Sequence, residues 1–162
     1  MQHDYFGTID TTDGAVWNGD VSVGGRQVEV DMTGEHTPSP ARLDAMAAIA
    51  GDVARLDRVA REAMFADLQN DDGTVLYVEH HLAELSPDHL TQTFGTANPA
   101  EVPAPLFLAK LVLRHVGLYP DSTSAVFDYT LDGEVTQYLL AITSTPTAPW
   151  RASRWRARLR HG

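Results

Sequence analysis

The chain contains no cysteine, and this absence excludes several kinds of protein. Without thiols there is no disulfide scaffold, no thiol nucleophile, no cysteine-ligated zinc and no iron–sulfur cluster. No apolar run approaches the roughly 20 residues that a membrane-spanning helix needs. The first twenty residues hold four aspartates and no Lys or Arg. They therefore lack the basic start of a secretory signal, and we predict a cytoplasmic protein without membrane attachment.

Basic residues are also scarce over most of the chain. Of its 162 residues, 43% are hydrophobic, which predicts one globular domain. All 22 acidic residues lie at or before Glu134, whereas five of the 12 basic residues are arginines within residues 151–162. Such an acidic body repels nucleic acid and anionic membranes and favours a basic protein partner. The alternative interpretation is that the acidic charge serves only to keep the protein soluble.

The clearest local signal is a β-hairpin near the N-terminus. Apolar residues alternate on both sides of Gly24-Gly25, and a two-residue glycine loop is typical of a tight hairpin turn. This turn pairs Val21 with Val28, Gly19 with Val30 and Trp17 with Met32. The apolar partners then share one face, and residues such as Asp20, Glu29 and Asp31 lie on the other.

The middle of the chain has helical periodicity. Ser39 followed by Pro40 fits a helix start, and apolar residues recur every three or four positions to about Gln69. Gly51 predicts a kink or a break into two helices. Shorter helices are expected over residues 75–85 and 86–93, followed by a proline-rich extended crossover at 96–105.

The C-terminal third is predicted to be mainly strand. Residues 106–119 are assigned to a strand that ends at Pro120, with Leu111, Leu113 and His115 on one face. A second hairpin, turning at Asp132-Gly133, would place Phe127 opposite Tyr138 and Tyr129 opposite Thr136.

The arginines near the C-terminus follow an alternating pattern. One parity holds arginines and the other holds apolar residues: Arg154, Arg156, Arg158 and Arg160 against Trp155, Ala157 and Leu159. This alternation predicts a half-buried terminal strand with an arginine-lined outer face, which would also resist edge-to-edge aggregation. A mobile nucleic-acid-binding arm is the alternative, but the acidic body opposes phosphate binding.

These elements predict an α+β fold. An antiparallel sheet is built from N-terminal and C-terminal hairpins, and the central helices pack on one of its faces. We expect a single domain over residues 1–162. It comprises a β-hairpin region at 1–33, a helical region at 39–94 and a C-terminal β region at 106–160.

Short motifs near both ends carry a resemblance to a known family. They are Tyr5-Phe6-Gly7, Trp17-Asn18-Gly19, Val126-Phe127-Asp128-Tyr129-Thr130 and Gln137-Tyr138-Leu139-Leu140. On these residues the chain resembles a bacterial family of domains of unknown function, number two thousand and four of that series, over roughly its whole length. The resemblance implies a shared fold and a bacterial cytoplasmic origin, and it brings no catalytic residues. The chain departs from the family pattern after the last hairpin, where Thr145–Pro149 and an arginine-rich strand replace an acidic terminus.

Candidate chemistry centres on one helical stretch. On a helix His80 and Glu84 lie one turn apart, with His81 beside them, and together these residues could bind a metal ion. A small metal-dependent hydrolase is the function this site implies. A solvated helix face explains the same pattern. No nucleophile elbow, phosphate loop or dinucleotide-binding motif is found.

Three further residues are candidates for binding, namely Asp128, Tyr129 and Trp155. Asp128 alternates with Phe127 and Tyr129 and so lies on the opposite face of its strand. A carboxylate on a covered face needs a partner, or its pKa rises.

The function that the sequence favours is a non-catalytic, acidic protein-binding module of the immunity or inhibitor type, with no cofactor and a basic protein partner. The balance of motifs leans against an enzyme. The metal-dependent hydrolase with His80, His81 and Glu84 is one alternative. An oligomeric structural domain, associating through a sheet edge or the apolar residues 106–113, is the other.

Overall fold

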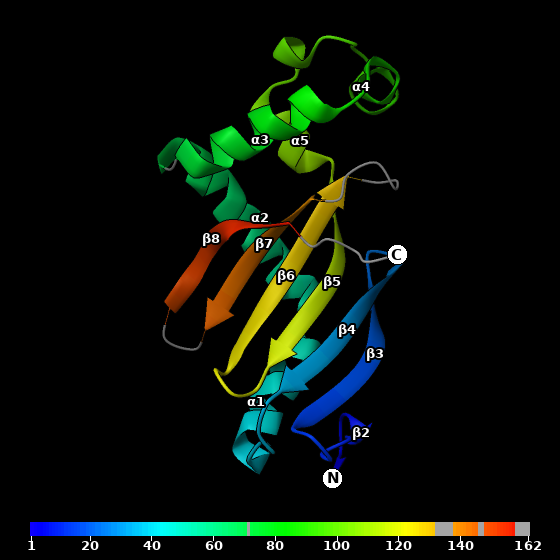
Figure 1. The fold of residues 1–162 in the computed structure, drawn as a ribbon, viewed down its shortest axis with the longest axis vertical. Helices are drawn as coiled ribbons and strands as arrows, with labels where there is room; N and C mark the ends of the chain where they lie inside the picture. The colour runs from blue at the N-terminus through cyan, green and yellow to red at the C-terminus, as the bar shows by residue number, and fades with distance from the viewer. Residues whose placement is uncertain (71, 132–137, 146–147, 158–162) are drawn as a thin grey trace.

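A six-stranded sheet in the order β3-β4-β5-β6-β7-β8 forms the centre of the molecule (Figure 1). The computed structural model describes residues 1–70, 72–131, 138–145 and 148–157. The strands of the sheet are β3 (Ala15–Val23), β4 (Arg26–Gly34), β5 (Leu111–Tyr119), β6 (Ser124–Leu131), β7 (Tyr138–Thr145) and β8 (Ala148–Ala157). A separate small ribbon pairs β1 (Gln2–His3) with β2 (Gly7–Thr8) near the start of β3.

The N-terminal hairpin has the predicted register. Val21 pairs with Val28, Gly19 with Val30, and Trp17 with Met32. Gly24 and Gly25 have φ angles of 57° and 80°. Positive φ at both turn positions is the geometry that glycine allows without strain.

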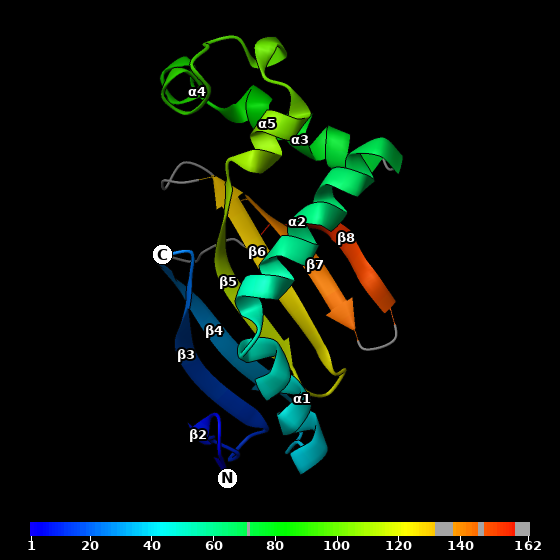
Figure 2. The same ribbon diagram turned by 180° about the vertical axis from the view of Figure 1, so that it is seen from behind.

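The helices begin and end where caps and glycine predict. Ser39 caps α1 (Pro40–Ala50) by accepting a hydrogen bond from the Arg42 backbone N–H, and α1 ends at Gly51. Helix α2 (Val53–Asn70) follows at once, so the predicted break at Gly51 is confirmed. Figure 2 shows α1 and α2 lying across one face of the sheet.

The remaining helices form a lobe at one end of the sheet (Figures 1 and 2). They are α3 (Asp72–Glu84), α4 (Pro87–Phe94), the 3-10 helix η1 (Pro99–Glu101) and α5 (Ala104–Ala109). Ser86 caps α4, and Gly95 ends it in the left-handed conformation. The Tyr77 and Phe107 side chains are fully buried in this lobe.

The core lies between the sheet and the covering helices. Val30, Met32, Val116 and Phe127 on the strands are buried on the inner face, as are Leu43, Met46, Ala60 and Met64 on the helices. The α+β class, with hairpins at the two ends of the chain and helices on one face, is therefore confirmed. The sheet is not antiparallel throughout, because β4 and β5 pair in parallel, with Glu29 opposite His115. The helices between them supply the crossover that a parallel pair requires.

The stretch after the crossover differs from its prediction in two ways. Residues 104–109 form helix α5, and the strand begins only at Leu111. The register of β5 against β6 then shifts between Leu113 and His115. This irregularity is a β-bulge at Arg114, and a bulge places two residues opposite one. His115 therefore lies on the opposite face from Leu111 and Leu113, contrary to the simple alternation.

The predicted register of the second hairpin is also wrong. Phe127 pairs with Ile142 and Tyr129 with Leu140, not with Tyr138 and Thr136. The pairing is thus shifted by four residues from the prediction, and Asp132-Gly133 lies outside the described residues. The predicted terminal strand is present as β8 at an edge of the sheet. Residues 158–160 of that prediction are not described.

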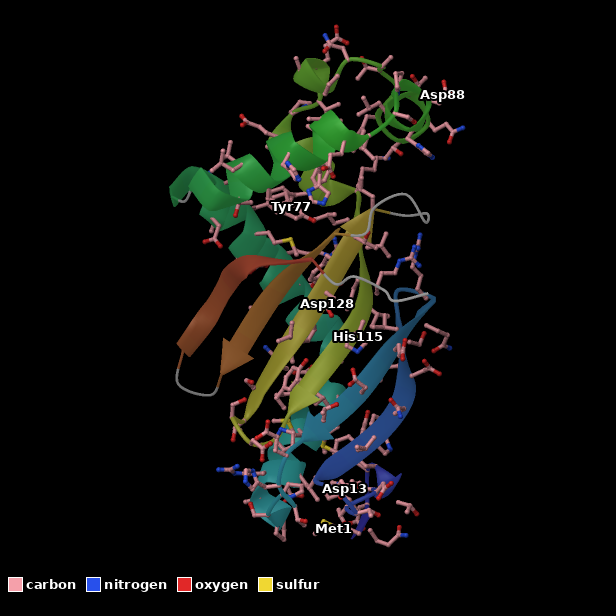
Figure 3. All side chains as sticks on the ribbon, in the orientation of Figure 1. Met1, Asp13, Tyr77, Asp88, His115 and Asp128 are labelled. Carbon is pink, nitrogen blue, oxygen red and sulfur yellow. The ribbon has the colours of Figure 1, made fainter. Side chains whose placement is uncertain are left out.

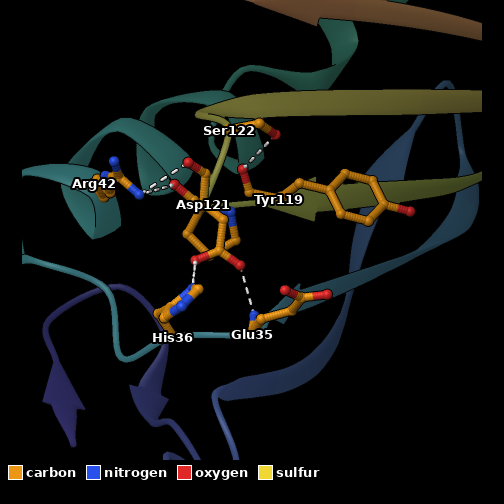
Figure 4. A network of polar contacts seen from close by, with 7 residues as sticks. Glu35, His36, Arg42, Tyr119, Asp121 and Ser122 are labelled. Carbon is orange, nitrogen blue, oxygen red and sulfur yellow. Dashed lines mark hydrogen bonds and ion pairs between the residues drawn. The ribbon is translucent and has the colours of Figure 1, made fainter.

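A polar junction ties the end of β4 and the start of α1 to the β5–β6 turn (Figure 4). The Arg42 guanidinium donates hydrogen bonds from Nη1 to the carbonyl oxygens of Pro120 and Asp121, at 3.2 and 2.9 Å. The Asp121 carboxylate accepts a hydrogen bond of 2.6 Å from the Glu35 backbone N–H and lies 3.3 Å from His36 Nδ1. The hydrogen bond from Glu35 lowers the pKa of Asp121.

Candidate functional site

The sheet face turned away from α1 and α2, here called the outer face, carries a row of carboxylates. On β4, Asp31 lies between the buried Val30 and Met32, so its side chain points outward. On β6, Asp128 lies between Phe127 and Tyr129, which face the core. Figure 1 looks onto this face, and α1 and α2 lie behind it. Strands β4 and β6 therefore each present an aspartate on the outer face.

The centre of the outer face is an ionic triad of His115, Asp31 and Asp128, one residue from each of three neighbouring strands. His115 Nδ1 lies 2.8 Å from Asp128 Oδ2, and His115 Nε2 contacts Asp31 Oδ1. The exposed fractions of the His115, Asp31 and Asp128 side chains are 13%, 23% and 11%. Figure 3 shows His115 and Asp128 side by side on the sheet. The triad joins β4, β5 and β6 through side chains as well as through the strand ladder.

The two carboxylates keep the His115 ring charged. Burial by itself lowers the pKa of His115, but the hydrogen bonds to Asp128 and Asp31 outweigh burial and raise the pKa to about 9. Both ring nitrogens of the imidazolium donate, one to each carboxylate, so neither is available to accept a proton or bind a metal ion. The triad is a structural ion cluster, and its two carboxylates and one imidazolium carry a net charge of −1.

A second pair of carboxylates lies beside the triad without a cation between them. Asp20 on β3 is directly opposite Glu29 on β4, and both side chains are exposed. Within the described residues, no ion pair joins either carboxylate to a basic side chain. Like charges directly opposite each other in a sheet are destabilising. The protein therefore keeps an unfavourable charge pair on its open face.

The inner face of β6 carries a different polar network. The Tyr129 hydroxyl, fully buried, donates a hydrogen bond of 2.7 Å to Asp57 Oδ1 on α2. The same carboxylate accepts from Arg61 Nε at 3.1 Å, and Arg61 Nη1 donates to the Leu111 carbonyl oxygen. Burial and the Asp57 carboxylate both raise the pKa of Tyr129. This network fixes α2 to the sheet and contains no group free to bind a ligand from solution.

Of the predicted metal-binding residues on α3, His80 and Glu84 meet at the surface, whereas His81 is buried. His80 Nε2 lies 3.3 Å from Glu84 Oε1, and both side chains are about half exposed. His81 is instead 1% exposed, with Nδ1 donating to the Tyr77 carbonyl oxygen at 3.0 Å and its ring packed on the Tyr77 ring. Burial lowers the pKa of His81. No group of three His, Asp or Glu side chains in the described part of the chain is arranged to hold a metal ion.

The predicted binding residues are likewise separated. Asp128 and Tyr129 are neighbours in sequence, but Asp128 belongs to the triad on the outer face and Tyr129 to the Asp57 network on the inner face. Trp155 lies on β8 at the far edge of the sheet. Of Asp128 and Tyr129, only Asp128 lies on the outer face.

Sequence reasoning missed His115. Its partners Asp31 and Asp128 were placed on the correct face by strand alternation, whereas the bulge at Arg114 reversed the direction of His115. The available signal was the polar dipeptide Arg114-His115, which interrupts the alternation of an apolar strand. Two consecutive polar residues in such a strand indicate a bulge, because both can then avoid the core.

Two hollows lie away from the triad. A groove of about 310 Å³ separates α3 from η1 and α5, and its walls are apolar apart from Glu79. A shallow hollow of about 710 Å³ lies beside the start of β3, between Met1, Thr8–Thr12 and Val16–Asn18. Neither hollow gathers several titratable side chains, so neither has the make-up of a hydrolytic site.

Comparison of the chain with family models, with curated proteins and with solved structures finds no match in any of the three. Among the described helices, none combines the length and the apolar character needed to cross a bilayer.

Proposed function

We propose that this protein is a non-catalytic binding module whose acidic outer face binds a basic protein, in the manner of an immunity protein or an inhibitor. The observation that carries the proposal is the exposed cross-strand pair of Asp20 and Glu29. A lysine or arginine placed between these carboxylates would relieve their repulsion, so a cationic partner gains more there than at an isolated surface acid.

The triad next to this pair supports the same interpretation. The positive charge of His115 is already shared between Asp31 and Asp128, so it does not neutralise Asp20 or Glu29. The parallel pairing places Glu29 beside His115 in the sheet, and the acidic row therefore continues across β3 and β4 to β6. Such a surface attracts basic partners at long range and loses that attraction in salt.

The test is capture of a basic partner by variants with matched charge. Asp20→Asn/Glu29→Gln removes two charges from the outer face, and Asp4→Asn/Asp88→Asn removes two exposed charges elsewhere. The wild type and the second variant should retain the same basic protein from native lysate at low salt and release it at high salt. The outer-face variant should bind that protein, once purified, about tenfold more weakly by calorimetry.

Equal binding by both variants would show that net charge, and not the outer face, attracts the partner. Failure of the wild type to retain any basic protein at low salt would overturn the proposal itself.

A further inference from the structure

Strand β3 forms an edge of the six-stranded sheet. Within the described residues it pairs with β4 along its whole length, and its other side carries only the bridge between Asp10 and Val16. Among the residues drawn as ribbon, Figures 1 and 2 show no further strand or helix alongside the rest of β3. Beyond Val16, the outer edge of β3 is therefore open as far as the described part of the chain is concerned.

The direction of the free backbone groups follows from that bridge. Val16 exchanges both of its backbone hydrogen bonds with Asp10, at 2.8 and 3.1 Å, so its N–H and C=O point away from β4. Backbone direction alternates along a strand. Asn18, Asp20 and Ser22 therefore also present their N–H and C=O groups outward, where another strand could pair with them.

This edge has none of the lysines, prolines or bulges that protect many edge strands, and its one charged residue is Asp20. Natural edge strands carry lysine, proline or bulges that block a further strand. The β3–β4 register runs unbroken over nine pairs from Ala15 to Val23, and β3 contains neither lysine nor proline. At the opposite edge, β8 has an irregular register against β7, and its sequence holds several arginines. The β3 edge is thus less protected than the β8 edge against pairing with a further strand.

The side chains of β3 specify what kind of strand would fit. On the inner face Trp17, Val21 and Val23 pack against the core but are only partly buried. On the outer face Asn18, Asp20 and Ser22 are exposed. An added strand would place alternate residues beside each row. Apolar residues would cover the inner row, and a lysine or arginine would lie opposite Asp20 and near Glu29.

We propose that the β3 edge binds an extended segment of a partner protein, in which basic and apolar residues alternate, by adding that segment to the sheet as a seventh strand. The choice of a basic partner rests on the proposed function, whereas the mode of binding rests on the open edge. Main-chain hydrogen bonds supply affinity in such strand addition, and alternate side chains supply specificity.

A second copy of this chain fits the edge less well through β3 itself. Two β3 strands paired antiparallel through all three outward residues would place Asp20 of one copy opposite Asp20 of the other, with Glu29 of each copy nearby. That arrangement repeats the unfavourable like-charge contact. The charge of the edge therefore selects against this self-pairing and for a basic strand.

The test uses an eight-residue peptide of alternating lysine and valine, with blocked ends, as the probe. The control peptide has the same composition but places the four lysines together. Amide hydrogen exchange of the wild-type protein, followed by NMR, should slow by about tenfold or more at Asn18, Asp20 and Ser22 when the alternating peptide binds. Gly19 and Val21, whose N–H groups face β4, should change little, and the control peptide should bind more weakly.

Two variants separate the edge from its charge. Ser22→Pro removes an outward N–H without changing charge or the ladder to β4, and we expect it to lose about tenfold in affinity for the peptide. Asp20→Asn keeps the backbone groups. It should bind the peptide more weakly than the wild type does at low salt, and the difference should shrink at high salt, which already weakens the attraction of Asp20 for lysine. Circular dichroism of Ser22→Pro checks that the variant is folded, and the exchange pattern of the wild type tests the edge independently.

Peptide binding without slowed exchange at these three amides would overturn the proposal, as would full affinity in folded Ser22→Pro. If the captured basic partner also binds Ser22→Pro normally but fails on Asp20→Asn/Glu29→Gln, the outer face is the binding site and the edge is not. Concentration-dependent protection of these amides without peptide would assign the edge to a second copy and overturn the choice of partner.

Discussion

His115 on β5 and Asp128 on β6 lie in contact on the outer face, with 2.8 Å between Nδ1 and Oδ2, because the bulge at Arg114 reverses the side-chain direction of the strand after Leu113. Without that extra residue the imidazole would point into the core. The bulge thus converts a buried polar residue into the cation that joins Asp31 and Asp128. Three strands are held together on this face by one charged side chain.

The triad predicts a loss of stability on the alkaline side of neutrality. The pKa of His115 is about 9 in the folded protein and about 6.5 in an unfolded chain. The folded state therefore holds a proton that the unfolded state releases. The contribution of the His115 charge to the free energy of unfolding is complete below about pH 6.5 and is lost as pH rises to about 9. We expect His115→Gln to lower the free energy of unfolding by about 3 kcal/mol at pH 6 and by much less at pH 9.5.

Urea unfolding of the wild type and of His115→Gln at pH 6, 7.5 and 9.5 measures this difference. His80→Ala, which removes an exposed histidine, serves as the control and should not show the alkaline effect. A His115→Gln deficit that is constant over this range would contradict a charged triad.

His81 predicts a loss of stability on the acid side. Burial lowers the pKa of His81, so between its folded value and about 6.5 the unfolded chain binds a proton that the folded protein does not. The contribution of neutral His81 to the free energy of unfolding is complete above about pH 6.5. It falls as pH decreases, by up to about 1.4 kcal/mol per pH unit. His81→Leu should flatten the decline between pH 6.5 and 5. Thermal melts at half-unit pH steps test this, and an unchanged slope would assign the decline to other groups.

The Tyr129 hydroxyl should stabilise the folded protein through its hydrogen bond to Asp57. Tyr129→Phe leaves the Asp57 carboxylate without its 2.7 Å donor, and removal of one partner of a buried hydrogen bond costs about 1–3 kcal/mol. Tyr5→Phe, at a tyrosine that is 44% exposed, should change stability by no more than about 0.5 kcal/mol. Chemical denaturation of both variants and of Asp57→Asn, completed as a double-mutant cycle with Tyr129→Phe, measures the coupling. A coupling near zero would mean that the contact carries no stability.

A side chain at Gly19 should destabilise the folded protein. A Cβ atom at this position would lie 2.4 Å from Cη2 and 2.6 Å from Cζ2 of the Trp17 ring. That ring is anchored by a hydrogen bond of 2.8 Å from Nε1 to the Phe6 carbonyl oxygen. Overpacking of this kind costs about 1–3 kcal/mol, so Gly19→Ala should melt at a lower temperature than the wild type. Asn18→Ala, at an exposed neighbour, is the matched control.

The same substitution in a Trp17→Phe background isolates the cause. If the Trp17 ring is the obstacle, Gly19→Ala should cost less there than in the wild type. An equal cost in both backgrounds would place the strain elsewhere.

Local patterns were sufficient for the elements that depend on nearby residues. The Gly24-Gly25 turn and the alternating valines predicted the β3–β4 register correctly, because a two-residue turn fixes which residues face each other. Ser39, Ser86 and Gly51 marked helix boundaries through caps and backbone freedom that act within one turn. The acidic side of the hairpin followed from the same alternation.

Local patterns failed where the outcome depended on distant contacts. Residues 106–109 were assigned to a strand but form part of α5, since a short apolar run suits either structure and only packing decides between them. The predicted β6–β7 register was also wrong, since Phe127 pairs with Ile142, four residues beyond Tyr138.

The sequence by itself determined the class of fold, the N-terminal hairpin, the helical middle and the acidic charge, since each follows from periodicity, turn chemistry or composition over a few residues. Only the tertiary structure decided that His115 would join Asp31 and Asp128, that His81 would be buried, and that β3 would be left as an open edge. His81 is buried by packing against Tyr77 and Phe107 within the helical lobe. Strand order, a parallel β4–β5 pair and a one-residue bulge set the other two features. The strand order and the parallel pair arise from contacts between segments more than eighty residues apart, which a local pattern does not encode. The bulge leaves the Arg114-His115 dipeptide as its one local sign.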